Sequence, residues 1–338
     1  MSTQNTTAEI NSITRIIRHP GLFHADDVCS VAFLRLLRVL APVEARVPTA
    51  EELDDPTVLV LDIGGRHEPE LLNFDHHQFR KEDWAVGRGA RWDGIPFAAF
   101  GLLVDHFAHH NLAVHQRLDE RLVQAVDAAD CGWEPQLEVW DDHQGCVGIG
   151  KWVAPGEGYP VPPRPAALSF SAVIAGFNGG LSSAAAERTA AFNAAVEVAK
   201  QVIANAVAEA ETFVEAKQAV LNARCAVDGQ VLVLDAFVPW DEHVFTRPDQ
   251  ANLLYVVFPS LRGGFSVQQV PEQPGSFKGR KPLPEAWVTP APKRGKELAD
   301  LLGLSAGGDA TFCHPGRFIG GAETLDDCLK MATLAVKA

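Results

Sequence analysis

The hydrophobic positions near the start of the chain predict a strand followed by a helix. Residues 13–17 form a short apolar run, which is the pattern of a strand, and a proline–glycine pair at 20–21 ends it. From about residue 26 the apolar positions recur three and four residues apart, so they lie on one face of a helix. Pro42 should end this helix, because proline lacks the amide proton and disfavours helical geometry in the residue before it.

Two further apolar segments extend this pattern into a sheet. A weak strand is expected over 43–47, and residues 57–63 are apolar on both faces apart from Thr57 and Asp62. A strand without a polar face suits the centre of a sheet that helices cover on both sides. The order strand, helix, strand, strand therefore predicts an α/β fold with a parallel sheet.

The remainder of the chain predicts long helices and then a second set of strands. Helices are expected at about 95–109, 115–129 and 183–223, with a surface loop at 154–166 that is rich in Pro and Gly. Short apolar runs predict strands at 231–234, 253–257 and 265–270, and a terminal helix is expected at about 323–336. We therefore expect a disordered tail at 1–12 and two domains, at 13–225 and 226–338.

Composition narrows the class of protein. Of 338 residues, 47% are hydrophobic and 21% are charged, which is typical of a soluble globular protein and too apolar for a disordered one. We expect no membrane span, because no uncharged apolar stretch of 18 residues occurs. The polar start lacks a signal-peptide pattern, and six cysteines occur without a CxxC pair, so a reducing cytoplasm is the expected location. A net charge of −14 excludes broad electrostatic capture of nucleic acid but leaves room for a local, metal-assisted phosphate site.

Histidine and aspartate gather in four clusters where predicted strands end or helices close. The clusters are His19 to Asp27, Asp62 alone, Asp75 to His77, and Asp127 to Asp130. In parallel α/β sheets, sites form outside the carboxyl ends of the strands, so the first two clusters should converge. Imidazole and carboxylate without thiolate suit Mn²⁺, Mg²⁺, Fe²⁺ or Zn²⁺, and the excess of carboxylates favours the harder ions.

Asp62 is the expected bridge between two such ions. Two ions about 3.5–4 Å apart need a shared ligand, and a short carboxylate at the end of a strand is rigidly held and has two oxygens to share. Each cluster also has a plainer interpretation. Asp26 could cap a helix, His76 and His77 could form an exposed turn, and Asp127 with Asp130 could be a solvated helix end. Four such clusters in an order that fits one sheet edge favour a metal site.

Taken together, these motifs resemble the DHH phosphoesterase superfamily and, within it, the melanocyte proliferating gene 1 family. The resembling segments are His19-x-Gly21-x-Phe23-His24-Ala25-Asp26-Asp27, Leu61-Asp62-Ile63-Gly64-Gly65, Phe74-Asp75-His76-His77-Gln78, Asp127-Ala128-Ala129-Asp130-Cys131-Gly132 and, near the far end, 268–271, 274–277, 280–285, 312–314 and 318–321. The resemblance implies a DHH-type phosphoesterase domain at 13–225, which includes connecting long helices, and a smaller α+β substrate-binding domain at 226–338. It also implies a metal-dependent hydrolase, and eukaryotic members are attributed 3′–5′ RNA exonuclease activity.

The resemblance also implies roles for individual residues. Two divalent ions, Mn²⁺ or Mg²⁺, are expected, with Asp62 bridging them. The residues at metal-ligand positions are His19, His24, Asp26, Asp62, His76 and Asp127. His77 matches the residue that faces the substrate phosphate, and Asp75 would orient the neighbouring imidazoles. Asp27 and Asp130 adjoin these positions, and Cys131 stands where many relatives carry asparagine.

Substrate-binding candidates also occur in the second domain. They are the Gly320-Gly321 pair with His314, and Lys281 within 278–297, where six basic and two acidic residues leave a local excess of four positive charges. A plain turn and a solvated surface run are the alternatives.

Three functions remain open at this point. The leading one is a metal-dependent phosphodiesterase, a 3′–5′ exonuclease on RNA or short oligonucleotides that uses a water activated by two metals. The overall acidity and scarce aromatics favour, as an alternative, a hydrolase of a small phosphate compound such as pyrophosphate or a dinucleotide. A non-catalytic metal-binding protein is the second alternative, and a homo-oligomer is possible in each case. The absence of GxxxxGK[ST] and GxGxxG disfavours a nucleotide-dependent ATPase.

Overall fold

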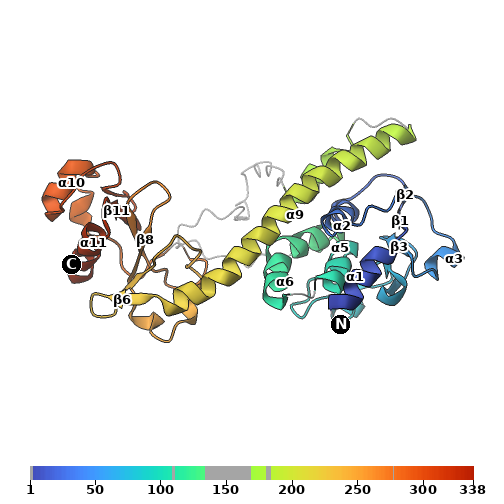
Figure 1. Cartoon of the computed structure of the whole chain (residues 1–338), viewed down its shortest axis with the longest axis horizontal. Helices are drawn as coiled ribbons and strands as arrows, with labels where there is room; N and C mark the ends of the chain where they lie inside the picture. The colour runs from blue at the N-terminus through green and yellow to red at the C-terminus, as the bar shows by residue number, and fades with distance from the viewer. Residues whose placement is uncertain (1–2, 109–110, 134–168, 180–183, 277) are drawn as a thin grey trace, which may run out of the picture. The chain divides into compact units, whose positions relative to one another are not determined.

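The computed structural model describes residues 3–108, 111–133, 169–179, 184–276 and 278–338 (Figure 1). These residues belong to two compact units, Met1–Ala210 and Glu211–Ala338. The division falls inside the long helix α9 (Ala185–Asn222), because residues of its first half pack into the core of the first unit while Val220 packs into a core of the second. The sequence predicted this helix at about 183–223 and the boundary near 226, where helix gives way to strand. The loop predicted at 154–166 lies outside the described residues.

The described part of the first unit contains a five-stranded sheet in the order β2-β1-β3-β5-β4. Its strands are β1 (Arg15–Arg18), β2 (Val43–Ala45), β3 (Val58–Leu61), β4 (His67–Glu68) and β5 (Asn73–Phe74). β1 pairs in parallel with β2 and β3, and β3 pairs in parallel with β5. The parallel α/β prediction is therefore confirmed, and only β4, antiparallel to β5, departs from it. β4 and β5 were not predicted, because two residues are too short to show a periodic pattern.

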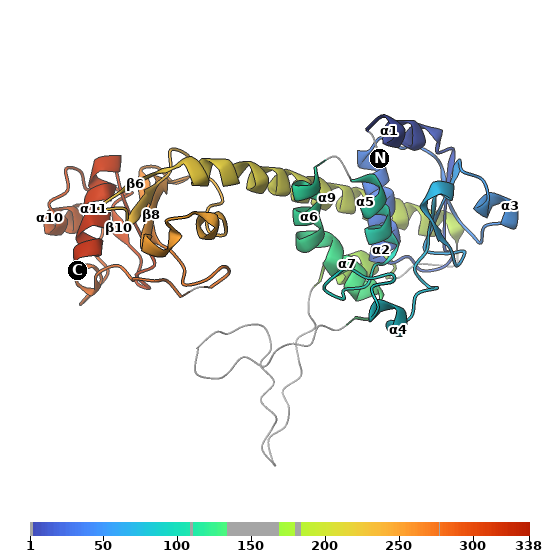
Figure 2. The ribbon, with the colours of Figure 1, turned by 90° about the horizontal axis from the view of Figure 1, so that it is seen from below.

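Helices cover both faces of the central strand β3, as its apolar sequence predicts. Leu59 and Leu61 pack with helices α2 and α5, and Val58 and Val60 pack on the other face with Leu53 of helix α3. α2 and α5 lie side by side (Figure 2). The helical elements of the first unit, besides α9, are α1 (Thr3–Ser12), α2 (Ala25–Leu36), α3 (Ala50–Leu53), η1 (Pro69–Leu71), α4 (Lys81–Trp84), α5 (Ala99–Phe107), α6 (Leu112–Leu118), η2 (Asp119–Val123), α7 (Gln124–Asp130) and α8 (Phe170–Gly176).

Several helices differ in detail from the sequence-based prediction. The helix expected at 115–129 is continuous from α6 through the π-helical turn η2 into α7. The disordered tail expected at 1–12 is replaced over Thr3–Ser12 by α1. Ile10 packs against the core, and the Glu9 carboxylate lies 2.9 Å from Nε2 of His106, so tertiary contacts hold a segment whose composition alone is polar. No helix in the described part of the chain is both long and apolar enough to cross a bilayer.

The second unit holds a six-stranded sheet among its described residues, in the order β10-β11-β9-β8-β7-β6. Its strands are β6 (Arg224–Ala226), β7 (Val231–Val233), β8 (Tyr255–Pro259), β9 (Phe265–Gln269), β10 (Phe312–Cys313) and β11 (Ile319–Ala322), and its helical elements are η4 (His243–Thr246), η5 (Gln250–Asn252), η6 (Glu285–Trp287), α10 (Gly295–Leu302) and α11 (Leu325–Lys337). β7 and β8 pair in parallel and the other neighbours antiparallel. α11 packs across β8, β9 and β11 (Figure 2). The three strands and the terminal helix predicted here are confirmed.

Candidate metal centre

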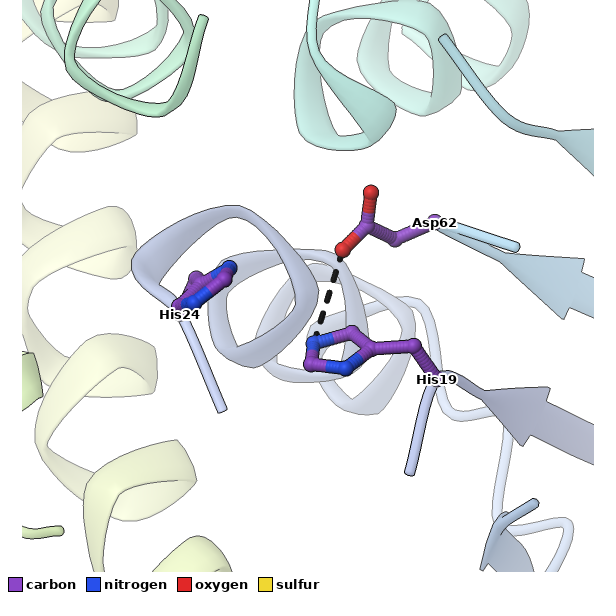
Figure 3. A group of neighbouring side chains, drawn as sticks. All are labelled: His19, His24 and Asp62. Atoms are coloured by element: carbon purple, nitrogen blue, oxygen red, sulfur yellow. Dashed lines mark ion pairs between the residues drawn. The ribbon is translucent and has the colours of Figure 1, made fainter. Parts of the chain in front are cut away.

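Three neighbouring parallel strands deliver the first histidines and aspartates to one edge of the sheet. His19 follows β1 directly, Asp62 follows β3, and His76 and His77 come shortly after β5. Since β1, β3 and β5 are adjacent and parallel, their carboxyl ends meet. Figure 3 shows His19 and Asp62 at the ends of their strands with their side chains turned toward each other, and His24 at the start of α2. The sheet topology therefore brings together the clusters of His19 and Asp62, as the sequence predicted.

Asp62 lies at the centre of these side chains. Its Oδ1 is 3.1 Å from Nε2 of His76 and 3.5 Å from Nδ1 of His77, and its Oδ2 is 3.5 Å from Nε2 of His19. The backbone of Asp62 has a φ of +55°, in the left-handed region, which aspartate tolerates better than most residues. Strain of this kind, of order 1–3 kcal/mol, tends to gather at functional sites. Gly64 and Gly65, both with positive φ, complete the turn.

Three overlapping groups of side chains place potential metal ligands close together. In each group the nitrogen and carboxylate oxygen atoms all lie within 4.8 Å of one another. The groups are His19 with His24 and Asp62; Asp62 with His76 and His77; and Asp26 with Asp62, His76 and Asp130. Asp62 belongs to all three. It is therefore the carboxylate common to every group of potential ligands found among the described residues.

Asp26 supplies an independent sign that this site suits a cation. The residue is fully buried in the first turn of α2, and neither of its carboxylate oxygens accepts a hydrogen bond from any residue that the structure describes. Burial, together with the nearby charges of Asp62 and Asp130, raises the pKa of Asp26 well above its usual value. A buried carboxylate that accepts no hydrogen bond is costly unless a cation or a proton compensates it. The donor set of imidazoles and carboxylates fits a divalent ion.

Asp75 holds the two histidines that follow it. Its Oδ1 accepts hydrogen bonds from the backbone amides of His76 and His77 and from Nδ1 of His77, at 2.8, 3.2 and 2.8 Å. Its Oδ2 accepts from the amide of Gly65. Burial raises the pKa of Asp75, but the bonds from His77 and Gly65 outweigh this effect and lower the pKa. An ionised, fixed Asp75 therefore orients the imidazole of His77, whose side chain is 64% exposed.

His76 is the buried member of the pair and contacts two carboxylates. Its Nε2 lies 3.1 Å from Asp62 and 3.2 Å from Oδ2 of Asp130. Burial lowers the pKa of His76, but the hydrogen bonds to Asp130 and Asp62 outweigh burial and raise it. Cys131 approaches the other ring nitrogen, with Sγ 3.5 Å from Nδ1. In this structure the ring therefore holds the last turn of α7 against the end of β5.

Asp27, which the sequence placed beside the ligands, acts at the start of α2. Its Oδ2 accepts hydrogen bonds from the backbone amide of His24 at 2.8 Å and from Nε2 of His19 at 3.1 Å. Its Oδ1 lies 3.6 Å from Nη1 of Arg18. Arg18 is only 3% exposed and lies against the ring of Phe192. Sequence reasoning missed Arg18, since a single arginine in a short strand gives no signal.

Asp127 and Asp130 occupy different environments although they are one helical turn apart. Asp127 is fully buried, where it accepts a hydrogen bond from Nη2 of Arg91 at 2.7 Å and from the amide of Gly101 at 3.0 Å. Burial raises the pKa of Asp127 to about 7 although Arg91 opposes this. Asp130 lies instead with His76 and, through Oδ1, 3.5 Å from Nδ1 of His24. The structure brings Asp130, and not Asp127, together with the other candidate ligands.

The substrate-binding candidates of the second unit lie in its sheet and beside its last helix. Nζ of Lys281 donates to the backbone carbonyl of Val336 at 2.8 Å, near the end of α11. His314 is exposed, and its ring lies against that of Phe318 in a tilted arrangement, with ring centroids 4.4 Å apart. A β-carbon on Gly320 or Gly321 would meet backbone oxygens at 2.9 and 2.8 Å, so close packing of neighbouring strands alone accounts for both glycines.

Comparison with known proteins places the whole chain in one family. Residues 15–336 match the family described as "Uncharacterised protein family (UPF0160)", whose profile is named MYG1_exonuc. The chain is 28% identical over 355 residues to the MYG1 exonuclease of Homo sapiens, covering 96% of this chain and 86% of that protein. It is 29% identical over 349 residues to the MYG1 exonuclease of Rattus norvegicus, covering 94% and 83%.

More distant relatives are similar over nearly their full length. The MYG1 protein of Schizosaccharomyces pombe is 25% identical over 345 residues, covering 97% of this chain and 98% of the relative. No solved structure matches significantly. Because the family match extends over almost the entire sequence, the chain belongs to the MYG1 exonuclease family.

Proposed function

We propose that the chain is a divalent-metal-dependent phosphodiesterase with a DHH-type catalytic domain. In this proposal it acts as a 3′–5′ exonuclease on RNA or short oligonucleotides. The single observation that carries the proposal is the sharing of Asp62 by three groups of potential ligands at the carboxyl edge of a parallel sheet. The relatives that carry the name exonuclease support phosphodiester hydrolysis as the reaction, since a nuclease must bind and cleave a phosphodiester.

Six side chains are proposed to hold two ions, Mn²⁺ or Mg²⁺. They are His19, His24, Asp26, Asp62, His76 and Asp130. Asp130 takes the place that the sequence resemblance gave to Asp127, because Asp127 is already compensated by Arg91. When bound, divalent ions at such a site polarise a phosphoryl oxygen and lower the pKa of a water to about 7.

His77 is the proposed contact to the substrate phosphate. Its Nδ1 donates to Asp75, and when the ring carries its second proton, Nε2 can donate a hydrogen bond to a phosphoryl oxygen. The exposure of the ring gives a substrate access to it. A donor held in place before the reaction stabilises the charge that develops on the phosphoryl oxygens without having to reorganise.

Two alternatives stay in competition with the exonuclease. A hydrolase of pyrophosphate or a dinucleotide would use the same ligands, and the net charge of −14 favours a small substrate over a long polyanion. A non-catalytic metal-binding protein would bind the ions without turnover. The exposed ring of His77, which belongs to one of the three ligand groups, favours an enzyme, because a purely structural metal site is closed to substrate.

The test combines metal analysis with a digestion series. Purified protein is analysed for bound metal and incubated under Mn²⁺ with single-stranded RNA labelled at the 5′ or 3′ end, with a dinucleotide and with pyrophosphate. Asp62→Asn should lose bound metal and hydrolysis together, whereas Glu51→Gln, an exposed acid on α3, should retain both.

Each outcome selects one function. Stepwise shortening of RNA from the 3′ end supports the exonuclease, and hydrolysis of the small substrates alone supports the first alternative. Bound metal without turnover on any substrate supports the second. Full turnover by Asp62→Asn would refute the proposed site.

A further inference from the structure

An open surface pocket of about 480 Å³, called the cavity below, lies between α4 and the residues that follow α7. Its lining consists of Lys81, Trp84, Ala85, Gly94, Gly132 and Trp133. Sites for small ligands commonly enclose about 300–1,000 Å³, so this cavity is large enough for a nucleotide. None of its lining residues belongs to the three ligand groups.

The residues that line the cavity follow shortly after candidate ligands in the sequence. Lys81 and Trp84 are the first and last residues of α4, which begins four residues after His77, and Trp133 follows Asp130 by three residues. An extended chain spans at most about 3.6 Å per residue, so Lys81 lies within about 14 Å of His77 and Trp133 within about 11 Å of Asp130. The amide of Trp133 also donates to the carbonyl of Ala128 at 2.9 Å, which folds this segment back against the end of α7. An RNA strand whose phosphate lies at the ligand groups can therefore place the base next to that phosphate in the cavity.

The chemistry of the lining suits a nucleotide. The indoles of Trp84 and Trp133 are half-buried, and each offers a flat apolar face on which a base can stack. The ammonium group of Lys81 is exposed and, within the described ranges, forms no ion pair, so it is available to a phosphate.

We propose that this cavity is a nucleobase subsite. A base stacks against Trp84 and Trp133, and Lys81 binds the phosphate of the same nucleotide. The inference rests on the proposed phosphodiesterase function and deepens it, because it selects nucleotide substrates over pyrophosphate. It adds recognition of the base to a centre that otherwise contacts only phosphate.

The test measures affinity for two probes that differ only in the base. AMP and ribose 5-phosphate are titrated into the metal-loaded protein by calorimetry. Because stacking on an aromatic side chain contributes about 1–3 kcal/mol per base, wild type should bind AMP about 5- to 150-fold more tightly than ribose 5-phosphate. Trp84→Ala or Trp133→Ala should reduce this preference to about twofold or less, and Trp84→Phe should retain most of it. Lys81→Gln should weaken both probes equally.

Trp92→Ala is the matched control. Trp92 lies in the same region of the chain but is 97% exposed and does not line the cavity, so its loss should leave the preference intact. Circular dichroism verifies that each variant is folded. Equal binding of AMP and ribose 5-phosphate by wild type, or an unchanged preference in folded Trp84→Ala and Trp133→Ala, overturns the inference. RNA hydrolysis by the same preparation reports on the proposed function separately, since hydrolysis without a base preference overturns the subsite alone.

Discussion

Replacing Asp127 and Asp130 by asparagine, one at a time, is expected to separate metal binding from packing. Both side chains come from α7, and both variants keep the size and shape of the original. Asp130 lies with His76 and His24, whereas Asp127 is enclosed by Arg91 and the amide of Gly101. Only the first substitution removes a carboxylate from a ligand group.

The magnitudes follow from these contacts. Residues that merely support metal ligands typically contribute 10- to 100-fold to affinity, so loss of a direct ligand should weaken Mn²⁺ binding by about 100-fold or more, or about 2.7 kcal/mol. Asp127→Asn should weaken it by less than about 10-fold. An amide at 127 can still accept a hydrogen bond from Gly101, and Arg91 keeps its ion pair with Asp119 at 2.6 Å. The free energy of unfolding should therefore fall by no more than about 2 kcal/mol.

Calorimetric titration of each metal-free variant with Mn²⁺ measures its affinity for the ion, and urea unfolding measures its stability. Glu51→Gln again serves as the control, because this exposed acid lies on α3 and outside the ligand groups. If Asp127→Asn lost metal while Asp130→Asn retained it, the assignment drawn from the structure would be reversed, and the position implied by the sequence resemblance would stand.

Three further substitutions test how the two units are stabilised. Arg91→Met should destabilise the protein by about 3–5 kcal/mol in urea unfolding, because it leaves the buried carboxylate of Asp127 without its cation. Asp327→Ala should cost about 2–3 kcal/mol, since Asp327 accepts hydrogen bonds from the amide and hydroxyl of Ser305 at 2.7 and 2.6 Å. Burial raises the pKa of Asp327, but the bonds from Ser305 outweigh it and lower the pKa. The stabilisation that Asp327 contributes should therefore be complete above about pH 4 and decrease as the pH falls further. Gly321→Ala should cost about 1–3 kcal/mol in thermal unfolding, because its methyl group would lie 2.8 Å from a backbone oxygen.

Matched controls distinguish these effects from general sensitivity. Arg88→Met removes an exposed arginine whose ion pair with Asp83 lies at the surface and should cost less than about 1 kcal/mol. Asp326→Ala changes the exposed neighbour of Asp327 in the same helical turn. Gly176→Ala adds a methyl group where no atom lies within 4 Å. Equal losses in variant and control would contradict the contact assigned to each residue.

Much of the first unit follows from local sequence pattern. The apolar runs around Ile16 and Leu59 and the helical spacing from Asp26 predict β1, β3 and α2, and the structure forms all three. Once β1 and β3 are parallel neighbours, His19 and Asp62 must approach each other, because each follows its strand directly. The approach of these two side chains could therefore be predicted without coordinates.

Other features depend on contacts that no local pattern contains. Helix α1 forms from a polar segment because it docks on the core, and the short strands β4 and β5 exist only through pairing with each other and with β3. Lys281 belongs to a basic stretch, yet its ammonium group finds a carbonyl 55 residues further along the chain. Composition could not distinguish that contact from a free basic surface.

Local sequence pattern cannot tell whether Asp127 or Asp130 lies with the candidate metal ligands, and the tertiary structure can. Spaced three residues apart in one helix, the two carboxylates are equivalent by local pattern. Arg91, brought in from a loop 36 residues earlier, neutralises one of them, and His76, from the end of a strand, contacts the other. Periodicity within a short window encodes strands and helices, but the partner that compensates a buried charge comes from elsewhere in the chain. The sequence by itself determined that His19 and Asp62 meet at the sheet edge, because each follows one of two neighbouring strands, and only the folded structure decided which carboxylate of α7 joins them.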